Sequence, residues 1–159
     1  MLEQSILTAE ELMSRDVKAV RPDSPLLAAV RKMADHHISG LVVVDEENRP
    51  VGMLTEGDLL RWHGEFTERQ AWWLDHLADG LELAPSFMEA IRSQQRKVSK
   101  LMSVGVVSVT PDTSAGEIAR LFYERKIKRV PVVRDGKLVG LVSRGDLLQA
   151  LARELAESK

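Results

Sequence analysis

Two short stretches of the chain carry a hydroxyl and a carboxylate three residues apart. They are Thr55-x-x-Asp58 and Ser143-x-x-Asp146, and each ends an apolar run. An ionised carboxylate has two oxygens that can accept hydrogen bonds from two neighbouring hydroxyl groups. The same spacing is also a capping-box pattern, with the acid in the first helical turn where the macrodipole favours it. A ligand role and a capping role both stay open, and they are compatible.

Both stretches belong to a longer internal repeat, hereafter the first and second copy. The order of the matching segments never changes along the chain. Two copies of one supersecondary unit usually pack together because neither can bury its apolar side alone. We expect packing about a pseudo-two-fold axis, with two equivalent clefts that could hold a ligand. The paired segments are 12–14 with 101–103, 20–23 with 109–112, 42–44 with 131–133, and 52–60 with 140–148.

The sequence pattern of each copy predicts secondary-structure elements in the order β-α-β-β-α. In the first copy Thr8 opens a capping box and a short helix to about Met13. A strand over 17–20 precedes a helix with Ser24 as N-cap. Strands 41–44 and 51–55 then form a hairpin, and a helix runs from about 56 to 62. The predicted apolar stripe of the long helix consists of Leu26, Leu27, Val30, Met33 and Ala34.

The second copy repeats this pattern with a tighter hairpin. A helix over 115–125 presents Ile118, Ala119 and Phe122, and strands 130–134 and 138–142 flank the turn Asp135-Gly136. A last helix covers 145–156. The predicted domains are therefore 8–62 for the first copy, 63–96 for an insert and 97–157 for the second copy.

The insert carries Trp72 and Trp73, with Trp62 just before it. Its apolar spacing predicts two amphipathic helices. One interpretation is a helical pair that packs onto the sheet. The other is a dimerisation surface or a lid, because aromatic residues are enriched at interfaces.

Composition excludes several classes of protein. The chain has 159 residues, a formal net charge of -2 and no cysteine, which excludes disulfides and thiolate chemistry. No run approaches the roughly 20 apolar residues that span a bilayer, and the start does not resemble a signal peptide. The four histidines lack metal-ligand spacing, and no nucleophile–base motif is present. We expect a cytoplasmic protein that is not an enzyme and that binds no metal and no membrane.

The repeated phrase Gly-x-x-[Thr/Ser]-x-x-Asp-Leu, with Ile38-Ser39-Gly40 and its partner segment, resembles the cystathionine-β-synthase (CBS) domain pair, or Bateman module, of the stand-alone type. The resemblance covers nearly the whole chain except the insert. It implies an α/β (α+β) fold of two β-α-β-β-α repeats and a regulatory role without catalysis. It also implies an adenosine-containing ligand such as AMP, ADP or ATP, no required cofactor, and a disc-like homodimer.

The resemblance also implies a ligand site in each copy. Asp58 and Asp146 match the carboxylate that holds a ribose diol, and Thr55 and Ser143 match a hydroxyl near a favoured phosphate position. Gly57 would let backbone approach the ligand closely. For each base-pocket residue, core packing is the alternative. The base-pocket candidates are Ala19, Val20, Ile38 and Leu41 in the first copy and Ser108, Val109, Ile127 and Val130 in the second.

The copies differ in charge where phosphate would be held. Arg125, Lys126, Lys128 and Arg129 replace His36, His37, Ser39 and Gly40, and Arg144 replaces Glu56. These cations could be solvated surface, or they could hold a di- or triphosphate, for which guanidinium geometry is suited. Val42 stands where the second copy has Pro131, so we expect unequal sites. Gly40, Arg129, Pro131 and Arg144 complete the candidate ligand residues.

Three functions remain from the sequence. The first is a sensor that binds an adenine nucleotide and passes its occupancy to a regulated protein. The second is a ligand-independent interaction module that acts through the tryptophan-bearing insert. The third, RNA or DNA binding through the second-copy cations, is disfavoured by the balanced net charge.

Overall fold

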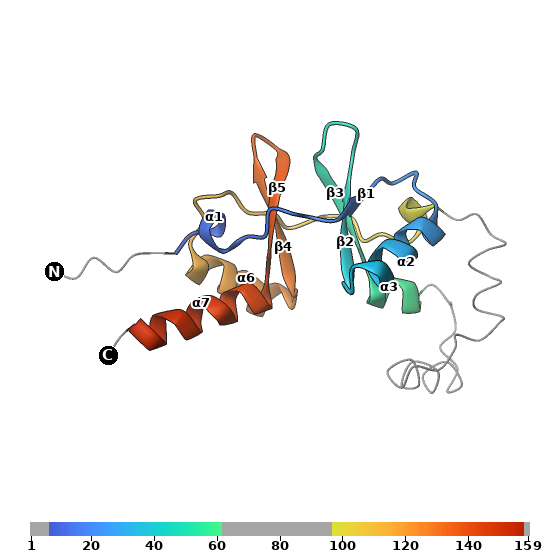
Figure 1. The fold of residues 1–159 in the computed structure, drawn as a ribbon. Helices are drawn as coiled ribbons and strands as arrows, with labels where there is room; N and C mark the ends of the chain where they lie inside the picture. Colours follow the sequence, from blue (N-terminus) through green and yellow to red (C-terminus); the bar gives the residue numbers. More distant parts are fainter. Residues whose placement is uncertain (1–6, 62–96, 158–159) are drawn as a thin grey trace, which may run out of the picture. The chain divides into compact units, whose positions relative to one another are not determined.

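The computed structural model describes residues 7–61 and 97–157 (Figure 1). The predicted insert and all three tryptophans lie outside the described residues. The first copy contains α1 (Ala9–Leu12), β1 (Ala19–Val20), α2 (Leu26–Asp35), β2 (Gly40–Val44), β3 (Pro50–Thr55) and α3 (Glu56–Arg61). The second contains η1 (Val98–Lys100), α6 (Ala115–Arg125), β4 (Arg129–Arg134), β5 (Lys137–Ser143) and α7 (Arg144–Glu157).

The strands form two small sheets. The first has the order β1-β2-β3, and β1 pairs in parallel with β2 through Ala19–Val42 and Val20–Val43. Every residue of β2 is buried, as its continuous β-branched run predicts. The second sheet is the antiparallel β4–β5 hairpin. The strand expected before α6 is reduced to a parallel bridge from Val109 to Val132. The mixed α/β class is therefore confirmed.

The chain divides into two compact units that do not coincide with the two copies. Unit 1 takes the described parts of Met1–Val17, Val44–Val51 and Gly105–Lys159. Unit 2 takes those of Lys18–Val43 and Gly52–Val104. Helix α1 therefore packs with α6 and α7 of the second copy, beside the β4–β5 hairpin (Figure 1). Ala9 of α1 is fully buried in the same core cluster as Ile118 and Val130.

The segment that starts each copy, α1 in the first and η1 in the second, lies in the unit that holds most of the other copy, and we call it the exchanged segment. Equivalent hydrogen bonds hold it in each unit. In unit 1 the amides of Ala9 and Glu10 donate to the carbonyls of Thr113 and Pro111 at 2.8 and 3.0 Å. In unit 2 the amides of Val98 and Ser99 donate to the carbonyls of Ser24 and Pro22 at 2.9 and 2.8 Å. These bonds satisfy amides at the helix start that have no intrahelical partner. Each exchanged segment is thus fixed by the Pro-containing loop of the other copy.

Two predicted caps are wrong. Thr8 makes no side-chain cap, because the loop carbonyls already serve the α1 amides, and its Oγ1 donates to Oε1 of Glu11 at 3.1 Å. Ser24 does not cap α2. Pro25 holds the cap position, and Ser24 Oγ accepts from the Arg21 amide at 3.1 Å. Its second-copy equivalent Thr113 accepts from the Thr110 amide in the same way.

The buried helix faces differ slightly from the predicted stripes. Leu26, Ala29 and Met33 of α2 are buried, whereas Ala34 is exposed. On α6, Ile118 and Phe122 are buried and Ala119 is exposed. Ala34 and Ala119 each directly follow a buried residue, and one step of about 100° turns them away from the core. Small alanines fit either environment, so the pattern alone could not assign them.

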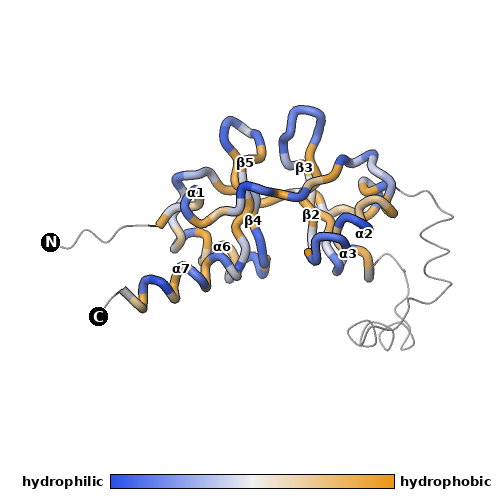
Figure 2. Tube along the Cα trace, viewed as in Figure 1, coloured by the Kyte–Doolittle hydropathy of each residue, from blue (hydrophilic) through white to orange (hydrophobic). Residues whose placement is uncertain are grey.

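The tips of both hairpins are hydrophilic (Figure 2). The tip 45–49 belongs to unit 1, where it meets the start of β5. The Leu138 amide donates to the Asn48 carbonyl at 2.8 Å, and Asn48 Nδ2 donates to the Leu138 carbonyl at 3.1 Å. Within 7–61 and 97–157, no helix has the length and apolar character that crossing a membrane requires.

Candidate functional site

In the second copy the Ser143–Asp146 motif forms a reciprocal cap at the start of α7. Oδ2 of Asp146 accepts from the Ser143 amide at 2.7 Å and from Ser143 Oγ at 3.0 Å. Ser143 Oγ in turn accepts from the Asp146 amide at 3.2 Å. This arrangement satisfies amides at the helix start and fixes the carboxylate in one position.

The Thr55–Asp58 motif of the first copy forms the same cap at the start of α3. Oδ2 of Asp58 accepts from the Thr55 amide at 2.9 Å and from Thr55 Oγ1 at 3.2 Å. Thr55 Oγ1 accepts from the Asp58 amide at 3.3 Å. The capping interpretation is therefore confirmed in both copies. Any ligand would be bound by carboxylate oxygens that the cap leaves unused.

The two carboxylates differ at their second oxygen. Oδ1 of Asp58 accepts from Ser103 Oγ at 2.9 Å, and the residue is only 5% exposed. Ser14, the equivalent of Ser103, makes the matching backbone pair with Leu141 at 2.9 and 3.0 Å. Its side chain makes no hydrogen bond to Asp146, however, and within the described chain Oδ1 of Asp146 accepts none. Asp146 is also half-buried rather than buried.

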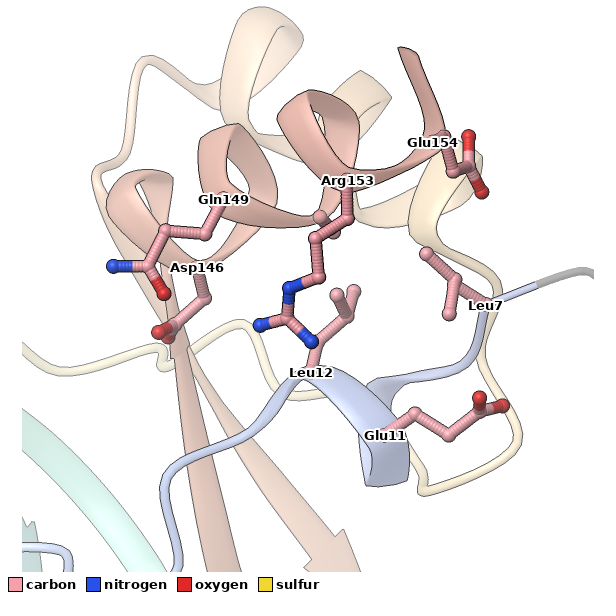
Figure 3. A pocket seen from close by; sticks show the side chains of 8 residues that line it. Leu7, Glu11, Leu12, Asp146, Gln149, Arg153 and Glu154 are labelled. Carbon is pink, nitrogen blue, oxygen red and sulfur yellow. The ribbon is translucent and has the colours of Figure 1, made fainter. Parts of the chain in front are cut away.

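Asp146 lines a cavity of about 240 Å³ in unit 1. The cavity lies along one face of α7, and residues of the α1 segment form its other wall (Figure 3). The guanidinium of Arg153 extends from α7 toward Leu12 (Figure 3). The lining residues are Leu7, Glu11, Leu12, Asp146, Gln149, Ala150, Arg153 and Glu154.

Seven of these lining residues were missed by sequence reasoning. A signal for the α7 members was present, because Asp146, Gln149 and Arg153 are spaced to share one helical face. The α1 members could not be found in this way. Their presence depends on the segment exchange between the copies, which no local pattern indicates.

The structure groups the predicted ligand residues by copy. Those of the first copy all lie in unit 2, and those of the second all lie in unit 1. The side chains of Val20, Leu41, Val109, Val130 and Pro131 are buried. A ligand could reach only the backbone of these residues. The Val109 amide already donates to the Pro131 carbonyl at 2.9 Å, so it is not available to a base edge.

The remaining base-pocket candidates are more accessible. Ile38 and Ile127 are half-buried, and Ser108 is exposed. Ala19 is half-buried, and its carbonyl accepts from Lys32 Nζ at 2.7 Å. Gly40 opens β2, and Gly57 lies in the first turn of α3. Their contacts with a base stay predictions.

Backbone contacts at the start of α7 bring together three of the second-copy cations, which are Lys128, Arg129 and Arg144. The Arg144 amide donates to the Lys128 carbonyl at 3.0 Å, and Arg129 pairs with Ser143 across the hairpin. In the first copy the equivalent bond runs from the Glu56 amide to the Ser39 carbonyl at 3.0 Å. The position of Arg144 is therefore held by an acidic residue in the first copy. Lys128 and Arg144 are exposed. Arg125 and Lys126 are exposed at the end of α6.

Residues 9–65 and 98–153 match the family model of the CBS domain, one match per copy. The chain belongs to the CBS domain family. The resemblance to the CBS domain pair that the sequence predicted is thus confirmed. The two matched segments contain both Ser/Thr-x-x-Asp motifs discussed above. They also contain the exchanged segments α1 and η1.

Several proteins resemble this chain along most of its length. An uncharacterized protein, MJ1426 of Methanocaldococcus jannaschii, is 30% identical over 155 residues, which cover 92% of each chain. The structure of CBSX2 from Arabidopsis thaliana in complex with AMP has a TM-score of 0.70 at 24% identity and covers 93% of this chain and 98% of its own. The CBS domain pair of protein MJ0100, in complex with 5'-methylthioadenosine and S-adenosyl-L-methionine, has a TM-score of 0.67 at 19% identity and covers 94% and 98%. These two structures support the fold.

Proposed function

We propose that this chain is a regulatory module that binds an adenosine-containing small molecule through its Ser/Thr-x-x-Asp motifs. The observation that carries the proposal is the hydrogen bonding of the two Asp146 carboxylate oxygens. Its Oδ2 is fixed by the cap, whereas Oδ1 accepts no hydrogen bond within the described residues and the side chain lines a cavity. A rigid carboxylate with unused acceptor capacity suits a pair of neighbouring hydroxyls.

The bound structures of CBS proteins support the ligand class. AMP in CBSX2, and methylthioadenosine and S-adenosylmethionine in MJ0100, share an adenosine moiety and differ in the 5' substituent. The ribose hydroxyls are the part of this moiety that a carboxylate would hold. The 5' substituent, which decides the cognate ligand, would be selected by other residues of the chain.

Regulation would follow from differential binding. Leu7, Glu11 and Leu12 of the α1 segment line the same cavity as Asp146. A ligand that contacts both walls would stabilise the arrangement in which α1 lies against α7. It can shift a conformational equilibrium only as far as its affinities for the two states differ. Occupancy would then be read by a protein that recognises this arrangement.

Thermal denaturation of the purified chain tests the proposal. The ligands are adenosine, AMP, ATP and S-adenosylmethionine, with GTP as the matched base control. A ligand at about 100 times its dissociation constant adds roughly 2.7 kcal/mol to the free energy of unfolding. We expect stabilisation by adenosine compounds and not by GTP. If none of these ligands stabilises the chain, or if GTP does so equally well, the proposal is wrong.

A homodimer remains a second proposal, supported by the surface of α7. Leu148, Leu151 and Leu155 are 67%, 52% and 65% exposed and recur at helical spacing. Such an exposed apolar stripe is typical of a helix–helix contact, and a closed dimer presents the same stripe from both chains. Light scattering should then give a dimer for the native chain and a monomer for Leu151→Glu. The tryptophan-bearing insert lies outside the described residues.

A further inference from the structure

We infer that a positively charged patch at the end of α6 is a binding surface for single-stranded nucleic acid. The patch lies where α6 ends and β4 begins (Figure 1). The inference goes beyond the proposed function, since it involves neither the α7 cavity nor a Ser/Thr-x-x-Asp motif. The residues of this α6 patch are Arg120, Tyr123, Arg125, Lys126 and Lys128.

The four cations of the α6 patch have no acidic partner. All four are exposed, and within residues 7–61 and 97–157 their side chains make no ion pair and no hydrogen bond. Elsewhere in unit 1, Arg134 pairs with Glu10 at 3.1 Å and Arg49 pairs with Asp45 at 2.9 Å. Guanidinium and ammonium groups that are not paired with an acid can donate to phosphate oxygens.

The net charge of the whole chain hides this local excess of positive charge. Residues 120–128 contain four cations and one acid, although the formal net charge of the chain is -2. The equivalent residues 31–39 of the first copy contain two cations and one acid. One of those two cations, Lys32, is half-buried and donates to the Ala19 carbonyl at 2.7 Å. A local cluster of exposed cations is the electrostatic footprint of a nucleic-acid surface.

Stabilisation of the helix accounts for only part of the α6 patch. Cations in the last turn interact favourably with the helix macrodipole, which explains Arg125 and Lys126. The effect is limited to that turn. Arg120 lies before the last turn and Lys128 lies beyond the helix, so the macrodipole explains neither of them.

Tyr123 adds an aromatic ring to the charged surface. The residue is 85% exposed. Arg120 precedes it by three residues and Lys126 follows it by three, a spacing that makes side chains neighbours on a helix. An exposed ring between cations can stack on a base while the cations hold the flanking phosphates. The equivalent residue of the first copy is Ala34, so α2 has no such ring.

The composition of the α6 patch favours nucleic acid over a protein partner. The core of a protein interface is depleted of charged residues, and lysine is depleted in particular. Proteins that bind single strands without sequence preference instead combine a cationic surface with aromatic side chains. The α6 patch has this second composition. We therefore expect it to bind single-stranded RNA or DNA of mixed sequence.

Fluorescence anisotropy with a labelled single-stranded RNA of about 12 nucleotides tests the role of the cations. Four phosphate contacts predict a slope of about -3 for the logarithm of the binding constant against the logarithm of the salt concentration. The double variant Lys126→Gln, Lys128→Gln should reduce the size of this slope by about 1.4. The matched control is Lys137→Gln, which removes an exposed cation at the start of β5 and should leave the slope unchanged.

Substitutions at Tyr123 test the role of the ring. Tyr123→Ala should weaken RNA binding by about 5- to 100-fold, because a stacked base loses its platform. The salt slope should stay the same, since no charge is removed. Tyr123→Phe keeps the ring and should bind within about twofold of the native chain. The melting temperature of each variant shows whether the fold is kept, and the exposure of Tyr123 predicts that it is.

Three outcomes would overturn the inference. They are no binding of the RNA at about 50 mM salt, equal affinities of the native chain and Tyr123→Ala, and displacement of the RNA by polyglutamate at the same concentration of charge. The last result would assign the α6 patch to acidic polypeptides. None of these outcomes bears on the binding of adenosine compounds, which thermal denaturation measures separately.

Discussion

The hydroxyl of Ser103 donates a 2.9 Å hydrogen bond to Oδ1 of Asp58, across 45 residues of sequence. The equivalent serine of the first copy, Ser14, makes the same backbone pair with its strand but no such bond to Asp146. One residue type in the same local sequence thus supplies a donor to the buried Asp58 carboxylate in unit 2 and leaves a carboxylate oxygen of Asp146 without that donor in unit 1. This difference supports the expectation that the two sites are unequal.

The Ser103–Asp58 bond predicts unequal effects of two matched substitutions. Ser103→Ala should lower the free energy of unfolding by about 1–3 kcal/mol, because a buried carboxylate oxygen loses its donor. Ser14→Ala should change it by less than about 0.5 kcal/mol, because the Ser14 side chain donates no such bond to Asp146 and is exposed. Urea unfolding of both variants measures the difference. Equal losses would mean that the hydroxyl bond contributes little.

Gly140 predicts a steric effect. A Cβ at this position would meet Met13 Sδ and lie 2.7 and 2.9 Å from Met13 Cγ and Cβ. Gly140→Ala should therefore destabilise the chain by about 1–3 kcal/mol. Adding Met13→Ala removes Sδ and Cγ from the clash, so the double variant should be more stable than the sum of the single changes predicts.

The matched control for this substitution is Gly116→Ala on α6. Its Cβ would meet nothing closer than Ser114 Oγ at 4.0 Å. Alanine is the better helix former, so Gly116→Ala should stabilise the chain by up to about 1 kcal/mol. If Gly140→Ala and Gly116→Ala changed the free energy of unfolding in the same direction, the contact with Met13 would not explain the effect at Gly140.

From the backbone angles at the ends of α2 and α6 we expect two substitutions to be stabilising. His37 and Lys126, which are equivalent in the two copies, have φ angles of 53° and 54°. Residues with a Cβ are strained in this left-handed region and glycine is not. His37→Gly and Lys126→Gly should each raise the free energy of unfolding by about 1 kcal/mol.

A neighbouring residue supplies the control for the helix ends. Arg125 is the last residue of α6 and precedes the left-handed position. Arg125→Gly should destabilise by up to about 1 kcal/mol, as glycine within a helix does. Chemical denaturation of the three variants checks both signs. Destabilisation by Lys126→Gly would show that its side chain makes a contribution larger than the strain.

The turn between β2 and β3 predicts a pH-dependent stability. The pKa of Asp45 is held below its ordinary value of 3.8, first by a hydrogen bond from the Arg49 amide and also by the Arg49 side chain and the Glu47 amide. A lowered pKa contributes stability that is present above the ordinary value and is lost as the pH falls through the lower folded value.

Asp45→Asn isolates this contribution. The native chain should melt at a higher temperature than the variant near neutral pH. The gap should narrow as the pH falls below about 3.8, because the native carboxylate then becomes protonated. Melting curves between about pH 6 and pH 2 measure it. A gap that does not change with pH would show that the charge of Asp45 does not stabilise the turn.

Much of the fold was predictable because it is specified locally. The bounds of α6, the Asp135-Gly136 turn and the cap at Ser143–Asp146 follow from residues within one turn of each other. The site was predictable only in part, since the capping pattern identifies Asp58 and Asp146 but gives no sign of what reaches their second oxygen. The cap assigned to Ser24 failed because Pro25 holds the cap position and the loop bonds the serine to Arg21.

The sequence by itself determined the repeat, the order of elements and the two candidate carboxylates, because periodicity and capping depend on neighbours along the chain. Only the tertiary structure decided that α1 packs with the second copy, that Leu12 and Arg153 share a cavity, and that Ser103 but not Ser14 bonds to its aspartate. Ser14 and Ser103 stand in the same Leu-Met-Ser phrase. The side-chain position that separates them is set by packing over the whole unit, and no local pattern records it.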